Sequence, residues 1–153
     1  LEALARRHAE AEGVADRAAE VERLVRAALG TDVVRMAAGA RHWRELYVGA
    51  PVGDRVLEGF VDLLFEGPDG LEVVDYKTDR VDTDDEIDRL LAHYRLQGAA
   101  YALAAASAVG RPVRRCSFLF LRGDSLRGTH AVVRAIEDLD AATAEVRALL
   151  EGG

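Results

Sequence analysis

Three charged side chains stand where two strand-like segments would otherwise be apolar. Asp62 lies inside the apolar segment 60–65, Asp75 follows the apolar pair 73–74, and Lys77 comes two residues later. Side chains alternate along a strand, so Asp75 and Lys77 project from the same face. The sequence therefore predicts a polar site with two carboxylates and one ammonium group at one end of a sheet.

A tight turn between the two segments would bring the carboxylates together. The stretch 67–70 has the sequence Gly-Pro-Asp-Gly, which is typical of a hairpin turn. Asp62 and Asp75 are equidistant from the centre of this turn. Antiparallel pairing of the two strands would therefore place Asp62 beside Asp75.

This combination of charges suits a divalent metal ion and a phosphodiester substrate. Two carboxylates held close together repel each other unless a cation lies between them. Hard oxygen ligands, with waters completing the shell, favour Mg²⁺ or Mn²⁺. A lysine adds a compact positive charge that can orient an attacking water or stabilise the transition state. We therefore expect metal-assisted phosphodiester hydrolysis, with Asp62, Asp75 and Lys77 as the catalytic residues.

The alternative for any one of these acids is a solvated turn residue near a strand end, and the acidic run at 82–85 fits that interpretation. The three residues together fit it less well. Lys77 is the only lysine among 20 basic residues, and the other 19 are arginine. The broad, permanently protonated fork of arginine does not replace a compact ammonium. A single lysine in this background indicates a chemical role.

The periodicity of the chain predicts the elements that would position these residues. We expect a helical lead-in over 1–40, broken near Gly13 and ending in a short turn at 33–38. A three-strand meander over 41–79 follows, and then a helix over 83–109 that starts with a capping box of Thr83 and Glu86 and ends at Gly110. Two strands within 113–135, joined by a turn at 122–128, and a C-terminal helix over 138–151 complete a mixed α/β domain.

Length and composition indicate one globular domain. At about 100–200 residues per domain, 153 residues make a single domain. The net charge of −7 argues against a surface that grips nucleic-acid phosphates throughout. Cys116, the one cysteine, excludes an internal disulfide or an iron–sulfur cluster held by this chain alone, and we expect it to be buried. No apolar run approaches the ~18 residues of a membrane span, so we expect no membrane contact and a cytoplasmic location.

These segments resemble the nuclease module of the RecB/AddA group of PD-(D/E)XK nucleases. The resemblance is carried by Gly-Phe-Val-Asp at 59–62, Val-Val-Asp-Tyr-Lys-Thr at 73–78, and Tyr-Arg-Leu-Gln at 94–97 followed by Tyr101. It extends from about residue 1 to residue 150. The resemblance implies a single nuclease domain over 1–153 with a restriction-endonuclease-like α/β fold, in which helices flank a mixed central sheet of about five strands.

The resemblance also implies roles for individual residues. Asp62 and Asp75 would be metal ligands, and the backbone carbonyl of Tyr76 would be a further ligand. Lys77 would be the catalytic lysine. The implied cofactor is Mg²⁺ or Mn²⁺, with no iron–sulfur cluster.

Further residues would support the site or contact DNA. Gln97 and Tyr101 lie four residues apart on one helical face, where they would orient the catalytic residues or the DNA backbone. For the rings of Tyr94 and Tyr101 the alternative is packing in the core. The complete set of expected supporting residues is Gln97, Tyr101, Thr78 and Glu45.

One part of the family pattern is missing. Most members carry a metal-binding His on a helix upstream of the strands, followed by a short apolar stretch and a Glu. This chain begins Leu1-Glu2, and its only methionine is Met36, so we expect a fragment of a longer helicase–nuclease from which that His is absent. His8 is a candidate substitute, and a solvated helix face is its alternative.

Three functions are consistent with these features. The first is a DNA exonuclease domain of a UvrD-like helicase–nuclease in double-strand break repair, supplied with single strands by helicase domains of the same polypeptide and possibly working with a second subunit. The second is a nuclease fold retained as a catalytically idle docking module. The third is a free-standing exonuclease of the phage type, which the absent initial methionine and the helical lead-in oppose.

Overall fold

The computed structural model describes residues 1–79, 81, 83–124 and 128–152. Its elements follow the predicted order of helices, three strands, a helix, two strands and a helix. In chain order they are α1 (Glu2–Ala11), η1 (Ala15–Arg17), α2 (Ala18–Leu29), α3 (Asp32–Gly39), β1 (His42–Val52), β2 (Arg55–Gly67), β3 (Gly70–Lys77), α4 (Asp84–Val109), β4 (Val113–Asp124), β5 (Gly128–Ala135) and α5 (Leu139–Glu151).

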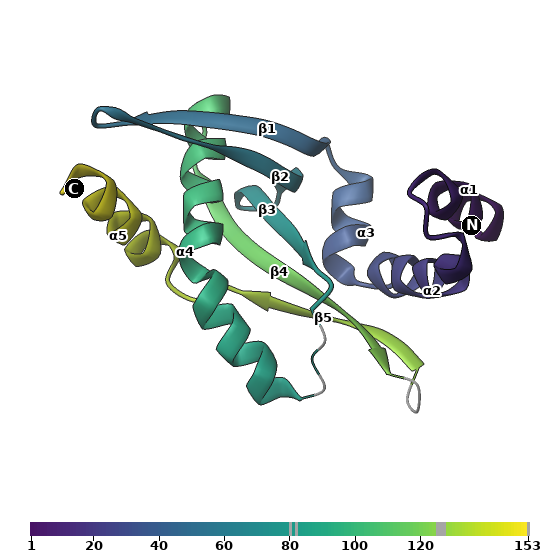
Figure 1. The fold of residues 1–153 in the computed structure, drawn as a ribbon. Coiled ribbons are helices and arrows are strands. Elements are labelled where there is room, and N and C mark those ends of the chain that lie inside the picture. The colour runs from purple at the N-terminus through teal and green to yellow at the C-terminus, as the bar shows by residue number, and fades with distance from the viewer. Residues whose placement is uncertain (80, 82, 125–127, 153) are drawn as a thin grey trace.

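The strands form one five-stranded sheet in the order β1-β2-β3-β4-β5 (Figure 1). β3 and β4 pair in parallel, and the other neighbouring strands pair antiparallel. Antiparallel neighbours need only short turns, whereas the parallel pair needs a long crossover, which α4 supplies. The mixed sheet with flanking helices confirms the predicted fold class.

Helices cover both faces of the sheet. α4 packs on β1, β2, β3 and β4 with α5 beside it, and α2 and α3 pack on the other face. Alternation along β3 divides its apolar side chains between two clusters. Val73 faces the α4 cluster and Val74 faces the α3 cluster. Each strand residue near the site is therefore assigned to one of two distinct faces.

The ends of α4 match the sequence prediction. The Thr83 hydroxyl accepts the Glu86 backbone N–H, and the Glu86 carboxylate accepts the Thr83 N–H, which completes the capping box. At the other end Gly110 adopts a left-handed conformation with φ 70°, which a side chain would oppose. These two signals fix the register of α4, and so determine which of its side chains face β3.

The N-terminal part differs from the prediction in one respect. The break at Gly13 is present, with φ 73°, but residues 32–39 form a regular helix and not a short turn. The Thr31 hydroxyl caps this helix, and Val33 and Ala37 bury its inner face against the sheet. Packing therefore extended a segment that its own periodicity left ambiguous.

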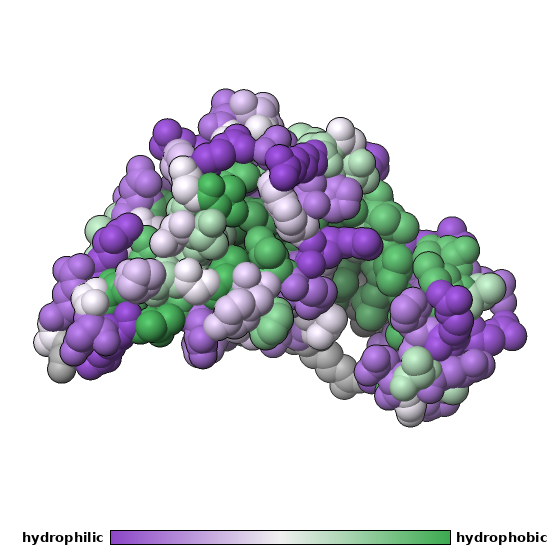
Figure 2. Space-filling view, turned by 90° about the horizontal axis from the view of Figure 1, so that it is seen from above, coloured by the Kyte–Doolittle hydropathy of each residue, from purple (hydrophilic) through white to green (hydrophobic). Residues whose placement is uncertain are grey.

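The α1–α2 region forms a smaller lobe beside the body of the molecule. Seen from above, hydrophilic residues cover much of both parts, and hydrophobic residues lie where the two meet (Figure 2). β4 extends to Asp124 and β5 begins at Gly128, so the predicted turn at 122–128 is shorter, and its residues 125–127 lie outside the described residues. No helix in the described part of the chain combines the length and apolarity needed to cross a bilayer.

Candidate active site

The site forms where β2 and β3 separate. Their antiparallel ladder runs from Gly67↔Gly70 to Leu63↔Val74, which is the register predicted from the turn. The next pair would be Asp62 and Asp75, but paired residues end one step earlier. The sheet therefore opens between the two strands at the position of the two carboxylates.

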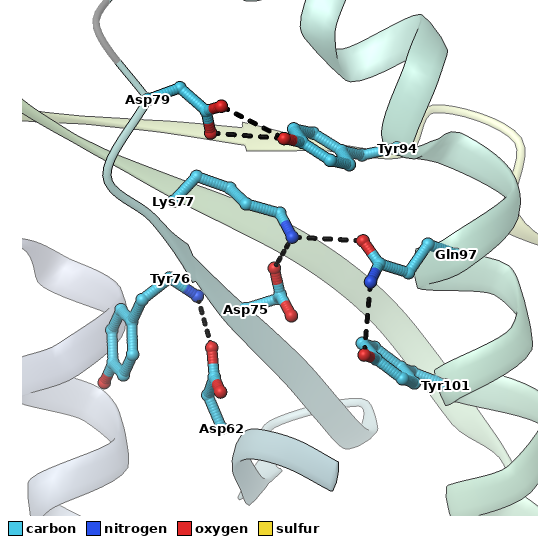
Figure 3. Close-up of polar contacts among 8 residues, drawn as sticks. All are labelled: Asp62, Asp75, Tyr76, Lys77, Asp79, Tyr94, Gln97 and Tyr101. Carbon is cyan, nitrogen blue, oxygen red and sulfur yellow. Dashed lines mark hydrogen bonds and ion pairs between the residues drawn. The ribbon is translucent and has the colours of Figure 1, made fainter. Parts of the chain in front are cut away.

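Asp62 replaces the missing strand contact with its side chain. Its Oδ2 accepts the backbone N–H of Tyr76 at 2.7 Å (Figure 3). An unpaired backbone N–H is costly in a protein interior, so this bond stabilises the opening. It also orients the Asp62 carboxylate toward β3, beside the point where Asp75 and Lys77 leave the strand.

Asp75 and Lys77 lie on the α4 face of β3, while the Tyr76 ring points to the opposite side (Figure 3). The Lys77 ammonium lies 2.6 Å from Asp75 Oδ2, and the two side chains are 13% and 7% exposed. Burial raises the pKa of Asp75 above its ordinary value; the hydrogen bond and charge of Lys77 oppose this rise, and the charge of Asp62 adds to it. The predicted common face of the two side chains is therefore present.

A chain of polar contacts connects the lysine to α4. Gln97 Oε1 accepts from Lys77 Nζ at 3.0 Å, and Gln97 Nε2 donates to the Tyr101 hydroxyl at 3.2 Å (Figure 3). The two contacts define which way the Gln97 amide points, because its oxygen and its nitrogen have different partners. Gln97 and Tyr101 thus lie where the resemblance placed them, and they hold the lysine from the helix side.

Tyr94 makes a second contact with the lysine, one that the sequence pattern did not reveal. Lys77 Nζ lies 4.0 Å from the centre of the Tyr94 ring, within the range of a cation–π interaction. The Tyr94 hydroxyl donates to Asp79 at 3.1 Å. Both tyrosine rings also pack against the α4 core cluster, as the packing alternative predicted. The spacing of Tyr94 three residues before Gln97 was the available signal for this role.

Glu45 lies across from Asp62 with an unusual backbone. It has φ 49°, the one positive φ of a non-glycine residue in the described part of the chain. The β1–β2 ladder continues on both sides, at Arg44↔Leu63 and Leu46↔Val61. Such conformations are strained and often occur at functional sites. The opening between β2 and β3 thus coincides with an irregularity in β1.

An open pocket of about 590 Å³ lies at this irregularity. It is lined by His42, Arg44, Glu45, Asp62 and Tyr76. Two carboxylates and a basic side chain share its wall, and Asp62 belongs both to this pocket and to the opening beside Asp75. His42 and Arg44 are pocket residues that no sequence motif identified.

The carboxylates fit a hard divalent cation in their chemistry. Asp75 Oδ2 is buried and accepts no well-formed hydrogen bond within the described part of the chain, so its short contact with Lys77 is an ion pair. A cation between Asp62 and Asp75 would satisfy such an oxygen. The described residues contain no group of three or more His, Cys, Asp or Glu side chains placed for a metal. Protein carboxylates, a backbone carbonyl and water would have to share the coordination.

The remaining candidates lie elsewhere. His8 is exposed on α1, which packs on α2 and η1, and the structure does not bring it to the acidic pair. Thr78 is exposed immediately after Lys77. Cys116 is fully buried, and burial raises the pKa of its thiol to about 12. Its predicted role as a small core residue is confirmed.

The comparisons with known proteins agree with this geometry. The family model of the PD-(D/E)XK nuclease superfamily matches residues 1–152. The chain belongs to this superfamily, and the predicted resemblance is confirmed.

The similar relatives are AddA-type proteins, described as subunits of an ATP-dependent helicase/nuclease. The protein from Desulforudis audaxviator is 41% identical over 78 residues, which is 50% of this chain and 6% of the relative. The protein from Thermoanaerobacter sp. is 32% identical over 71 residues, which is 46% of this chain and 6% of the relative. The matches thus cover a small part of much longer proteins.

A solved structure supports the fold. A protein from Eubacterium rectale, provisionally assigned as an exonuclease, aligns with a TM-score of 0.57 and 14% identity. The alignment covers 92% of this chain and 51% of the other. At this identity the likeness concerns the fold alone.

Proposed function

We propose that this protein is a divalent-metal-dependent deoxyribonuclease that hydrolyses phosphodiester bonds as an exonuclease domain. The observation that carries the proposal is the arrangement of Asp62, Asp75 and Lys77 at the opening between β2 and β3. Two carboxylates face a site for a cation, and a compact ammonium lies against one of them. Structural ion pairs seldom need this combination at a break in a sheet.

The residues of the chain have separate tasks in this proposal. Asp62 and Asp75, with the Tyr76 carbonyl, would hold Mg²⁺ or Mn²⁺. When bound, the cation polarises the phosphate and lowers the pKa of a bound water. Asp62 enters this task already oriented by its bond to the Tyr76 N–H. No histidine of the described residues takes part.

Lys77 supplies positive charge to the reacting phosphate. Hydrolysis forms a bond from a water oxygen to phosphorus and breaks the bond from phosphorus to the ester oxygen, so negative charge accumulates on the phosphate oxygens. An ammonium fixed beside Asp75 by Gln97 and the Tyr94 ring meets this charge without reorganising. Gln97 and Tyr101 orient the lysine, and Glu45 and Thr78 remain candidates for DNA or metal contacts.

The setting we propose is an AddA-like helicase–nuclease that processes DNA double-strand breaks in the cytoplasm. The relatives described as helicase/nuclease subunits support it. The net charge of −7 suits a domain that receives single-stranded DNA from helicase domains of the same polypeptide, with a second subunit as a further partner.

The test is cleavage of labelled single-stranded DNA with Mg²⁺ or Mn²⁺, by this protein and by its Lys77→Ala variant. We expect metal-dependent cleavage that falls at least about 100-fold in the variant, because the charge opposite the transition state is lost. Circular dichroism should show an unchanged fold. Cleavage that persists in Lys77→Ala would contradict the proposed role.

A catalytically idle docking module is the second candidate. The observation that favours it is that the described residues include no third acidic, His or Cys side chain grouped with Asp62 and Asp75. It predicts that neither metal supports cleavage. Calorimetry would then find no Mn²⁺ binding that depends on Asp62.

A further inference from the structure

We propose that Gly59 is a positioning residue for Lys77. The missing side chain at this position lets the Tyr101 ring lie against β2, and Tyr101 holds Gln97, which holds the lysine. The consequence for catalysis rests on the proposed nuclease function. The positioning of the lysine does not.

Gly59 lies in the interior of a long strand, where glycine weakens the sheet. It pairs with Val48 of β1. Its φ is not among the positive values found for other glycines, so its backbone is open to any residue. A reason for glycine here must therefore come from space and not from backbone conformation.

The space at Gly59 is filled by Tyr101. A Cβ built on Gly59 would lie 2.9 Å from Cε1 of the Tyr101 ring and 3.6 Å from its Cδ1. Carbon atoms in good contact are about 3.5–4.0 Å apart. An alanine would have to push the ring or the strand by roughly 0.6 Å.

Tyr101 has little freedom to absorb such a shift. Its hydroxyl accepts from Gln97 Nε2 at 3.2 Å, already the long end of the range for this type of bond. Gln97 Oε1 is bound to Lys77 Nζ at 3.0 Å. A displaced ring therefore loses the amide or takes it along, and in both cases the contact that fixes the ammonium changes (Figure 3).

The chain offers a direct probe of this effect. Lys77 is the only lysine in the sequence, so labelling with ¹³C,¹⁵N-lysine gives the NMR signals of one lysine side chain. Its ammonium lies 4.0 Å from the centre of the Tyr94 ring, where ring currents make the signals sensitive to small displacements. This readout needs neither DNA nor metal.

The matched control is Gly49→Ala. Gly49 lies in β1 of the same hairpin, opposite Glu58. A Cβ there would meet nothing nearer than the Leu57 carbonyl oxygen at 4.0 Å. We expect Gly59→Ala to shift the lysine signals and Gly49→Ala to leave them unchanged, with the fold of both variants verified by circular dichroism and thermal unfolding.

The kinetic arm uses a double-mutant cycle with Tyr101→Leu, which removes the ring. In the wild-type background we expect Gly59→Ala to lower kcat about 10-fold or more with little change in KM. In the Tyr101→Leu background the same substitution should change kcat by less than about twofold, because nothing remains for the methyl group to displace.

The outcomes separate the two proposals. Unchanged lysine signals in a folded Gly59→Ala variant would overturn the positioning role, and so would equal losses of kcat in both backgrounds. If the wild-type protein cleaves no DNA, the nuclease proposal fails, while the lysine signals still decide whether Gly59 positions Lys77.

Discussion

At the scale of single residues, the site depends on side chains that satisfy two demands at once. Asp62 supplies a carboxylate for a cation and also accepts the N–H of Tyr76 that the separated strands leave unpaired. Its two oxygens can divide these tasks. A substitution can therefore remove the charge and still preserve the hydrogen bond that shapes the opening.

Asp62→Asn makes that separation. The amide oxygen can still accept the Tyr76 N–H, so we expect the fold to persist, while Mn²⁺ affinity falls at least about 10-fold because a charged ligand is lost. Isothermal titration calorimetry measures the change. Asp54→Asn, at an exposed position of the β1–β2 turn, is the control and should bind as the wild type does. Equal affinities for all three proteins would argue against Asp62 as a ligand.

The residues that could be predicted were those with strong local signals. Asp62, Asp75 and Lys77 stood out because charged residues interrupt apolar segments. His42 and Arg44 did not, because their place at the pocket depends on the positive φ of Glu45 and on how β1 lies against β2. The direct bond from Gln97 to Lys77 likewise depends on the docking of a helix, which spacing along the chain does not determine.

At the scale of elements, turns and caps carried most of the predictable information. The 67–70 turn determined the register of β2 on β3, and the caps at Thr83 and Gly110 determined the extent of α4. The 32–39 helix was missed because packing against the sheet, and not intrinsic periodicity, completes it. Strand ends near 122–128 were similarly set by pairing between β4 and β5.

β3 also carries a buried carboxyl away from the site. Glu72 is 6% exposed. Burial raises its pKa above the ordinary value of 4.5, the charge of Arg115 opposes the rise, and the charge of Asp69 adds to it. The folded protein therefore binds this proton more tightly than the unfolded chain does. The resulting stabilisation is full below pH 4.5 and is lost as the pH rises through the folded-state pKa.

Glu72→Gln tests this linkage. We expect the free energy of unfolding of the wild type, relative to the variant, to fall as the pH rises from 4 toward neutrality, by about 1.4 kcal/mol for each unit of pKa elevation. Urea denaturation at several pH values measures it. Glu10→Gln, at an exposed position on α1, should show a nearly constant difference. A constant difference for Glu72→Gln as well would refute the linkage.

At the scale of the whole molecule, the acidic balance separates catalysis from capture. Twenty basic residues face 27 acidic ones, so the protein as a whole repels a polyanion. The proposed site concentrates positive charge at one lysine held between β3 and α4. Such a domain can act on DNA that is delivered to it, but it attracts free DNA poorly.

Binding of free DNA should therefore be weak. In EDTA, which prevents metal-dependent cleavage, we expect this protein to bind a short fluorescent single strand no more tightly than about 10⁻⁴ M at physiological salt, the weak end of non-specific binding. Fluorescence anisotropy measures the affinity. Micromolar binding with a steep salt dependence would contradict this expectation and would indicate a concentrated basic surface.

The order of the strands has a consequence for how the protein folds. β1, β2 and β3 join through short antiparallel turns, whereas β3 meets β4 only after the whole of α4 has been made, with Leu71 paired to Val113. Short loops close at lower entropic cost than long ones, so we expect local hairpins to form early and the parallel pairing late. Asp62, Asp75 and Lys77 would then assemble before Gln97 arrives on α4 to hold the lysine. A newly synthesised chain would carry its acidic pair first and gain an ordered lysine only in the last steps of folding.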